Sequence, residues 1–395
     1  MKQEKSFFNA WKIFLITLFG VGIAVFFLLR TLNQTRFIPV EKGTGKYHWI
    51  GTTATPDLTN VHEFVPAQSR KGDYIKDDLA HVIQSIDWTE NTFFWLCLAV
   101  FMMVGRDLFY MIRIRILTKS QLSWYRSMIT ILLWEFASAL TPGIVGGSAV
   151  AMFILNKEKI EIGRATAIVV ITAFLDNLFY ILLLPFLLIF LQFDLLFPTK
   201  SVGESSLHVA FWTGYSVMLL ICILIFTALF FQPKIVLKIV NLIFSLPILR
   251  KRKVKALNTA KSIEQASTEL KHERKGFWVK SFIATCGSWL SRYFVVNCII
   301  AAFLPISLTK HIFILAKQLV MWLFLLVSPT PGASGIAEYA FSELLVDLSS
   351  SALLLAGLAI IWRLISYFPY LFIGVMILPK WIKKHSSLSR GNNNW

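Results

Sequence analysis

The sequence predicts an all-α polytopic membrane protein, and its composition, apolar segments and basic loops all favour this class. Of the 395 residues, 56% are hydrophobic and only 15% are charged, and the mean hydropathy is +0.64. Soluble domains have about 45–50% apolar and about 25% charged residues. A water-soluble enzyme of this length, a disordered chain and a disulfide-rich secreted scaffold are therefore excluded.

Eight apolar segments approach or exceed the length of helix that crosses a bilayer, which is about 20 residues. They are residues 11–29, 92–112, 123–139, 165–193, 208–231, 277–304, 311–327 and 351–378. We expect six regions along the chain: an N-terminal transmembrane anchor (1–30), an extracytoplasmic loop or small cap (31–90), a first membrane repeat (91–231), a basic amphipathic cytoplasmic segment (232–276), a second membrane repeat (277–378) and a basic cytoplasmic tail (379–395).

The excess of basic residues predicts the orientation. Lys and Arg number 39 against 22 Asp and Glu, which gives a net charge of +17. Because Lys and Arg gather on the cytoplasmic side of membrane proteins, beside anionic lipid, we interpret this excess as a topology signal and predict no nucleic-acid partner. The basic runs within 232–276 and 379–395 place both termini in the cytoplasm. The expected location is the plasma membrane of a bacterium.

Two similar motifs predict an internal repeat. Residues 141–147 (TPGIVGG) and 330–335 (TPGASG) each follow an apolar helix and precede a short apolar piece. The first piece has about 13 residues, or about 20 Å as a helix, which is too short to span. The topology closes only if both pieces form re-entrant hairpins or neither does, and their lengths favour both. Two inverted repeats, each with a Pro-Gly re-entrant hairpin, are typical of transporters.

The chemistry of these turns suits irregular backbone at membrane depth. Proline removes one backbone donor, and glycine widens the range of allowed dihedral angles. Such backbone is tolerated only where it is buried in protein or lines a wet cavity. The short helix after each Pro-Gly would point its free N–H groups toward the membrane centre, an arrangement that favours phosphate.

Ionisable residues inside apolar segments usually mark a pathway or an ion pair. The candidates are Arg106, Asp107, Arg126, Glu135, Asp176, Arg292, Lys317, Glu338, Glu343 and Arg363. We interpret Arg106 and Asp107 as a local interfacial pair, and Arg126 and Lys317 as side chains that extend to the interface. Two alternatives stay open for Arg292 and Arg363: phosphate binding or structural pairing. Glu338 either pairs with one of these arginines or binds a headgroup amine.

The second motif carries a family resemblance. Residues 329–338 (PTPGASGIAE) resemble the PTPGGxGxxE signature of the flippase-like transmembrane domain, which is the membrane domain of lysylphosphatidylglycerol synthases and also occurs as stand-alone proteins. The first turn resembles the family's earlier P-GG motif, and Arg363 matches its late arginine. The resemblance covers residues 92–378. This chain departs from the pattern at Ala333, where glycine is usual, and before Asp176, where an arginine is often found.

The resemblance implies binding or translocation of a membrane lipid, either an anionic phospholipid or a polyprenyl-phosphate-linked substrate, in a groove between the two hairpins. The predicted substrate-binding residues are Thr141, Pro142, Gly143, Gly146, Gly147, Asp176, Arg292, Thr330, Pro331, Gly332, Gly335, Glu338 and Arg363. We predict no catalytic residue, metal or cofactor. A membrane-embedded lipid-linked transferase and a non-catalytic partner of a separate lipid synthase remain as alternatives, and a homo-oligomer also stays open.

Overall fold

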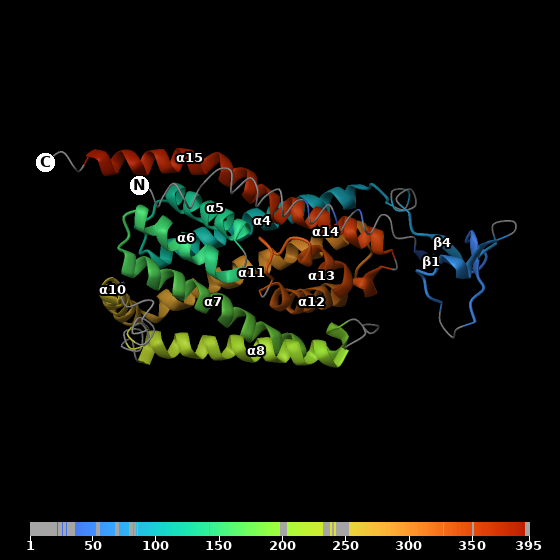
Figure 1. Cartoon of the computed structure of the whole chain (residues 1–395), viewed down its shortest axis with the longest axis horizontal. Coiled ribbons are helices and arrows are strands. Elements are labelled where there is room, and N and C mark those ends of the chain that lie inside the picture. The colour runs from blue at the N-terminus through green and yellow to red at the C-terminus, as the bar shows by residue number, and fades with distance from the viewer. Residues whose placement is uncertain are drawn as a thin grey trace.

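The computed structural model describes residues 36–52, 56–67, 71–78, 86–141, 143–197, 204–231, 253–326, 328–349 and 351–391, with single positions at 22, 26, 29, 82, 84, 238 and 241. Its helices are α4 (Glu90–Leu117), α5 (Trp124–Leu140), α6 (Gly143–Lys157), α7 (Ile162–Leu188), α8 (Glu204–Phe226), α10 (Lys253–Lys271), α11 (Lys275–Phe303), α12 (Leu308–Leu326), α13 (Ile336–Leu344), α14 (Ala352–Ser366) and α15 (Phe368–Gly391). The prediction of a helical membrane architecture is confirmed, with one small sheet in addition (Figure 1).

The small sheet lies within the region expected to be a loop or cap. Its strands are β1 (Phe37–Pro39), β2 (Tyr47–Trp49), β3 (Phe64–Pro66) and β4 (Tyr74–Lys76), joined antiparallel in the order β1-β4-β2-β3. Phe37 and Phe64 stack at its centre with ring centroids 4.1 Å apart, which gives the sheet its own small core. After β4, the Asp77 carboxylate accepts bonds from the Ser351 hydroxyl and the Leu353 N–H at the start of α14. These bonds fix the cap to the helical part.

Six helical stretches of the described part are long and apolar enough to cross a membrane, and they correspond to six of the eight predicted segments. One of them, Ala352–His385, runs across α14 and α15. Segment 11–29 lies outside the described residues except for three positions. Segment 123–139 forms α5, whose 17 residues make a helix of about 25 Å, shorter than the roughly 30 Å hydrocarbon core.

Helices α4 and α11 pack along each other at the centre of the bundle. Gly287 of α11 lies against the ring of Phe109, so close that a Cβ there would come within 2.6 Å of it. Small residues allow this approach of two backbones in a membrane bundle. The pair therefore forms a tightly packed wall to which the other helices attach.

The helices before and after each TPG motif form a pair, α5 with α6 and α12 with α13. The two pairs lie toward opposite ends of the molecule. The ribbon shows α5 and α6 on the side of α10 and the end of α15, whereas α12, α13 and α14 lie on the side of the β-strands (Figure 1). Contacts at each end agree: Glu158, after α6, contacts Trp381 of α15, while Asp77 of the cap contacts Ser351 before α14.

The last predicted segment, 351–378, is two helices rather than one. Helix α14 ends at Ser366, and Tyr367 between α14 and α15 has φ −126° and ψ −58°. Pro369 follows two residues later and has no N–H to continue the hydrogen-bond ladder of α14. The break places Tyr367 where it can face the centre of the bundle.

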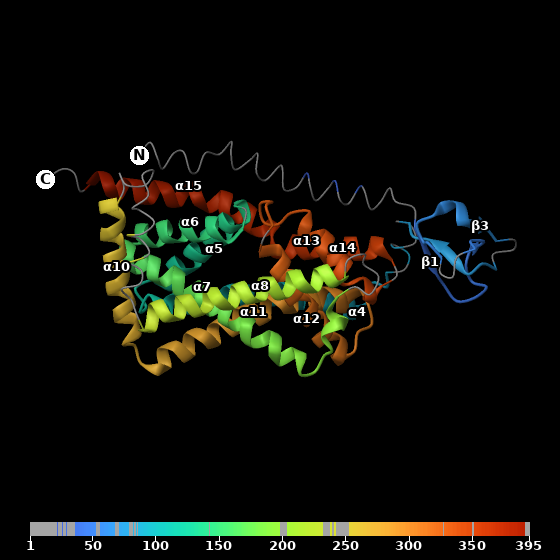
Figure 2. The ribbon, with the colours of Figure 1, turned by 60° about the horizontal axis from the view of Figure 1, so that its bottom comes forward.

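Helix α10 lies within the predicted basic amphipathic segment. It crosses the end of the bundle at a steep angle to the other helices (Figure 2). Ala266 and Leu270 are buried in the core cluster that includes α7, while Lys261 and Lys271 are exposed. An apolar face on the bundle and a basic face outward suit a helix that lies at a membrane surface.

Candidate functional site

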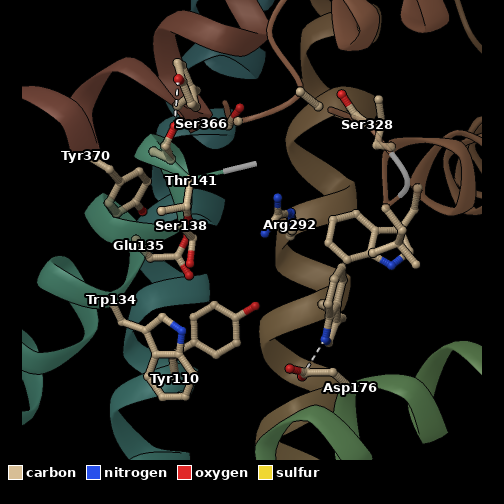
Figure 3. Close-up of a pocket in the computed structure, with 18 of the residues that line it drawn as sticks. Tyr110, Trp134, Glu135, Ser138, Thr141, Asp176, Arg292, Ser328, Ser366 and Tyr370 are labelled. Carbon is tan, nitrogen blue, oxygen red and sulfur yellow. Dashed lines mark hydrogen bonds between the residues drawn. The ribbon is translucent and has the colours of Figure 1, made fainter. Parts of the chain in front are cut away.

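A cavity of about 320 Å³ lies at the middle of the bundle, between the two helix pairs. Its walls come from α4, α5, α6, α7, α11, α12, α14 and α15, together with the turn before α13. The lining is rich in aromatic rings, hydroxyl groups and charged side chains (Figure 3). Polar groups at this depth are tolerated because they line a cavity rather than face lipid.

Arg292 of α11 projects into the cavity toward α5 (Figure 3). Its guanidinium carbon lies 5.4 Å from the ring centroid of Trp289 and 5.2 Å from that of Trp322. Two aromatic faces stabilise a cation in this way without neutralising it. Arg292 is half-buried and has no ion-pair partner among the described residues. It therefore remains available to an anion.

The opposite wall carries Glu135 of α5, which faces Arg292 across the cavity (Figure 3). Behind Glu135 lies Arg106 of α4, whose relative exposure is 0%. Arg106 forms ion pairs with Glu135 and with Asp107, the latter at 3.6 Å, and lies over the rings of Tyr110 and Tyr370. A buried guanidinium is stable only when paired in this way.

Asp176 of α7 also lines the cavity and is held from two sides. It pairs with Arg113 at 2.5 Å and accepts a hydrogen bond of 2.8 Å from the indole N–H of Trp289. Arg113 in turn donates to Thr285 of α11 at 3.2 Å. Asp176 is thus paired with an arginine of α4 that lies 63 positions earlier in the chain.

The second TPG turn is fixed by a buried ion pair. Arg363 of α14 lies 2.9 Å from Glu338 of α13, and it donates to the carbonyl of Gly332 and the hydroxyl of Ser334 at 2.9 and 3.0 Å. The other oxygen of Glu338 accepts the N–H of Gly335 at 2.6 Å. The expectation of free N–H groups at the start of this short helix is therefore wrong for Gly335, because Glu338 caps it.

Tyr367 connects the two turns. Its hydroxyl donates to the carbonyl of Ala139, near the end of α5, at 3.1 Å. The guanidinium of Arg363 lies 3.8 Å from the centroid of its ring. That ring also lies against Gly332, where a Cβ would come within 2.2 Å of it. The single side chain thus holds both turns at the same wall of the cavity.

We expect Gly332→Ala to destabilise the protein by about 1–3 kcal/mol, since it adds a clash at a positive φ. Gly332 and Ala333 both have positive φ, 55° and 54°. Ala333→Gly, which restores the usual family residue, is expected to be neutral or stabilising within about 1 kcal/mol. Thermal unfolding of both variants in detergent measures this. Equal losses in the two variants would contradict a steric origin for the glycine.

Among the residues whose surroundings the structure describes, five of the predicted site residues line the cavity: Thr141, Asp176, Arg292, Gly332 and Arg363. The positions of the others are as follows. Gly143, Gly146 and Gly147 begin α6, Thr330 bonds to the carbonyl of Ser334, and Pro331 and Gly335 belong to the second turn. Glu338 is buried behind that turn, and Pro142 lies outside the described residues.

Two predictions about intramembrane charges need correction. Arg106 is buried at the bundle centre with Glu135, because its neighbours supply a second carboxylate, and is not interfacial. Lys317 is fully buried and pairs with Asp347 at 2.5 Å. Arg126 pairs with Glu158 at 2.5 Å at the end of the α5–α6 pair, and its predicted position at the interface stays a prediction.

Sequence reasoning also missed Glu135 and the aromatic lining as parts of the site. The signal was present for Glu135: it is an acid in a helix too short to span, a few residues before a Pro-Gly turn. The aromatic residues gave no such signal, because apolar segments are rich in them throughout.

The helical bundle with its polar central cavity defines an integral membrane protein. The chain belongs to the family described as the lysylphosphatidylglycerol synthase TM region, which matches residues 75–374. It is also similar to a UPF0104 membrane protein of Archaeoglobus fulgidus, with 25% identity over 303 residues, 71% of this chain and 85% of the relative. No solved structure matches. The family resemblance seen in the second motif is thereby confirmed.

Proposed function

We propose that this protein is a lipid flippase that binds an anionic headgroup in the central cavity while the acyl chains stay in the bilayer. The observation that carries the proposal is Arg292: a half-buried cation in a polar cavity, with no ion-pair partner in the described part of the chain. A guanidinium presents a fork of donors that matches phosphate oxygens. Arg363, which is already bonded to Glu338 and Gly332, serves to shape the site instead.

The proposal includes two inverted repeats. Equivalent neighbours pack in both halves: α4 with α5 and α11 with α12, α5 with α6 and α12 with α13, α6 with α7 and α13 with α14. Helices α5, α6 and α13 have 17, 15 and 9 residues, which supports hairpins that enter from opposite sides and meet at the cavity. A headgroup in this cavity would be reachable from either leaflet after a small movement of one hairpin.

The proposed orientation places α10 and the end of α15 in the cytoplasm of a plasma membrane and the β-strands outside. The basic side chains of α10 and α15 favour this orientation. Ion pairs between Lys119 and Glu273 and between Arg126 and Glu158 lie at the same end.

Cysteine labelling tests the orientation of the two hairpins. The label near the end of α6 is placed at Asn156, which is exposed, whereas the neighbouring Glu158 is buried. The four native cysteines are removed first. Val346 is 44% exposed near the opposite end. A membrane-impermeant maleimide should label V346C in intact cells, and N156C only after permeabilisation. Labelling of both from the same side would contradict the inverted hairpins.

Reconstitution tests the function itself. Vesicles of phosphatidylcholine with a trace of fluorescent phosphatidylglycerol should exchange that lipid between leaflets faster with the protein than without it. Dithionite quenching of outer-leaflet fluorescence measures the exchange, with and without a pH gradient. If protein-containing and empty vesicles show equal rates under both conditions, the flippase proposal is wrong. Product formation from the lipid would instead favour a transferase.

A further inference from the structure

The charges at and directly behind the cavity balance when no ligand is bound. Among the described residues, three guanidinium groups, Arg106, Arg113 and Arg292, accompany three carboxylates, Asp107, Glu135 and Asp176. Arg363 and Glu338 form a further neutral pair. A phosphodiester adds one negative charge to this cavity. Such a charge is strongly unfavourable unless a positive charge enters with it.

One arginine serves two carboxylates at this site, and only one of the carboxylates faces the cavity. Arg106 pairs with both Glu135 and Asp107. Glu135 lines the cavity, whereas Asp107 lies behind it and accepts a hydrogen bond of 2.7 Å from the Tyr370 hydroxyl. If Glu135 gains a proton, Arg106 keeps Asp107 as its counter-ion. The arrangement therefore accommodates both protonation states of Glu135 without leaving a buried charge unpaired.

The groups that face Glu135 come from four neighbouring elements. They are Arg106, Asp107, Tyr110 and Arg113 of α4, Asp176 of α7, Arg292 of α11 and Tyr370 of α15. On α6, which packs against α5, Lys157 and Glu158 lie at the last turn and beyond it, and Glu158 pairs with Arg126 near the start of α5. Arg292 is thus the cation that faces Glu135 from the far wall of the cavity. A phosphate on Arg292 neutralises this cation and adds negative charge near Glu135.

We propose that the headgroup enters the cavity together with one proton, which moves from water onto the carboxylate of Glu135 as the phosphate binds Arg292. This inference rests on the proposed function and adds a coupling ion to it. Because linkage is reciprocal, lipid binding then promotes proton uptake, and protonation promotes lipid binding. Affinity for an anionic lipid rises as the pH falls. A proton gradient across the membrane can therefore bias the direction of translocation.

Calorimetry on the full chain in detergent tests the coupling. Dioctanoyl phosphatidylglycerol is titrated into the protein in buffers with different ionisation enthalpies, at one pH. The slope of the observed heat against the buffer enthalpy gives the protons exchanged per lipid. We expect uptake approaching about one proton per lipid bound for the wild type. Binding with no buffer dependence overturns the proton proposal and leaves the flippase proposal standing, and this result needs no variant.

Variants separate the two proposals. E135Q should bind the lipid with little or no proton uptake, because the amide cannot take the proton. D107N should also lose uptake, since the site then has three guanidinium groups against two carboxylates and can accept the phosphate without a proton. The control E343Q removes an exposed acid of α13 and should keep both binding and uptake. Full proton uptake by folded E135Q would contradict the assignment to Glu135. Unchanged binding by R292Q would instead contradict the proposed function.

Discussion

Replacing Arg292 with glutamine is expected to lower the affinity for an anionic headgroup about 10- to 100-fold, because the headgroup loses its charge-assisted hydrogen bonds. Translocation of fluorescent phosphatidylglycerol in vesicles should fall in parallel. The fold should survive, because in the described part of the chain Arg292 has aromatic contacts but no ion-pair partner to leave unpaired. Melting temperature in detergent provides this check.

Two further variants sharpen the test of Arg292. R292K keeps the charge but loses the planar fork and its stacking between Trp289 and Trp322, so we expect an intermediate affinity. K280Q removes a cation from the exposed surface of the same helix and should behave as wild type. If K280Q and R292Q reduced binding equally, a general loss of positive charge would explain the effect, and the cavity would not be the site.

The fold could be predicted from the sequence where hydropathy alone determines it. Five apolar segments became single helices of spanning length, and residues 141–147 and 330–335 marked the places where helices stop. The same reasoning did not predict the sheet within residues 37–76. Strands of three residues are too short to show a recognisable alternation of apolar and polar side chains. The same reasoning predicted one apolar segment for 351–378, whereas the structure has two helices there. The helix ends before Tyr367, whose ring packs against Gly332, and Pro369 follows.

The candidate site was predictable to a lesser degree. The sequence marked Arg292, Arg363, Glu338 and Asp176 as costly charges in apolar surroundings, and the structure shows that three of them line one cavity. Which charge would remain without a partner was not predictable. That outcome depends on contacts between distant segments, such as Arg113 with Asp176 across 63 positions of the chain. Pairing in three dimensions separates the charges that hold the bundle from the charge that can bind a ligand.

This separation also explains the two roles of arginine at the cavity. Arg106, Arg113 and Arg363 each have a carboxylate partner and are largely buried. A charge held in this way cannot easily exchange its partner for a substrate, because the partner would then be left buried and unpaired. Arg292 has no carboxylate partner in the described part of the chain, so it can bind and release an anion without leaving a buried carboxylate unpaired. The wall opposite it is built from paired charges that keep their positions.

The Glu338–Arg363 pair is expected to be the largest single contribution to the stability of the second turn. Both residues are buried, at 7% and 6% exposure, and the pair also holds the backbone at Gly332 and Gly335. Removing one partner leaves a buried charge, so E338Q and R363Q should each cost about 3–5 kcal/mol. Thermal unfolding in detergent and recovery of folded protein measure the loss.

A double-mutant cycle distinguishes a structural pair from a binding pair. If the pair acts mainly on the fold, E338Q/R363Q should lose less than the sum of the single variants, with a coupling of about 1–3 kcal/mol, because no isolated charge remains. E343Q, which removes an exposed acid of the same short helix, serves as the matched control and should keep wild-type stability. If the double variant folded normally but lost headgroup binding as completely as R292Q, Arg363 would belong with Arg292 as a ligand of the phosphate. Additive losses in the cycle would mean that the two side chains stabilise the turn independently, through Gly335 and Gly332 rather than through each other.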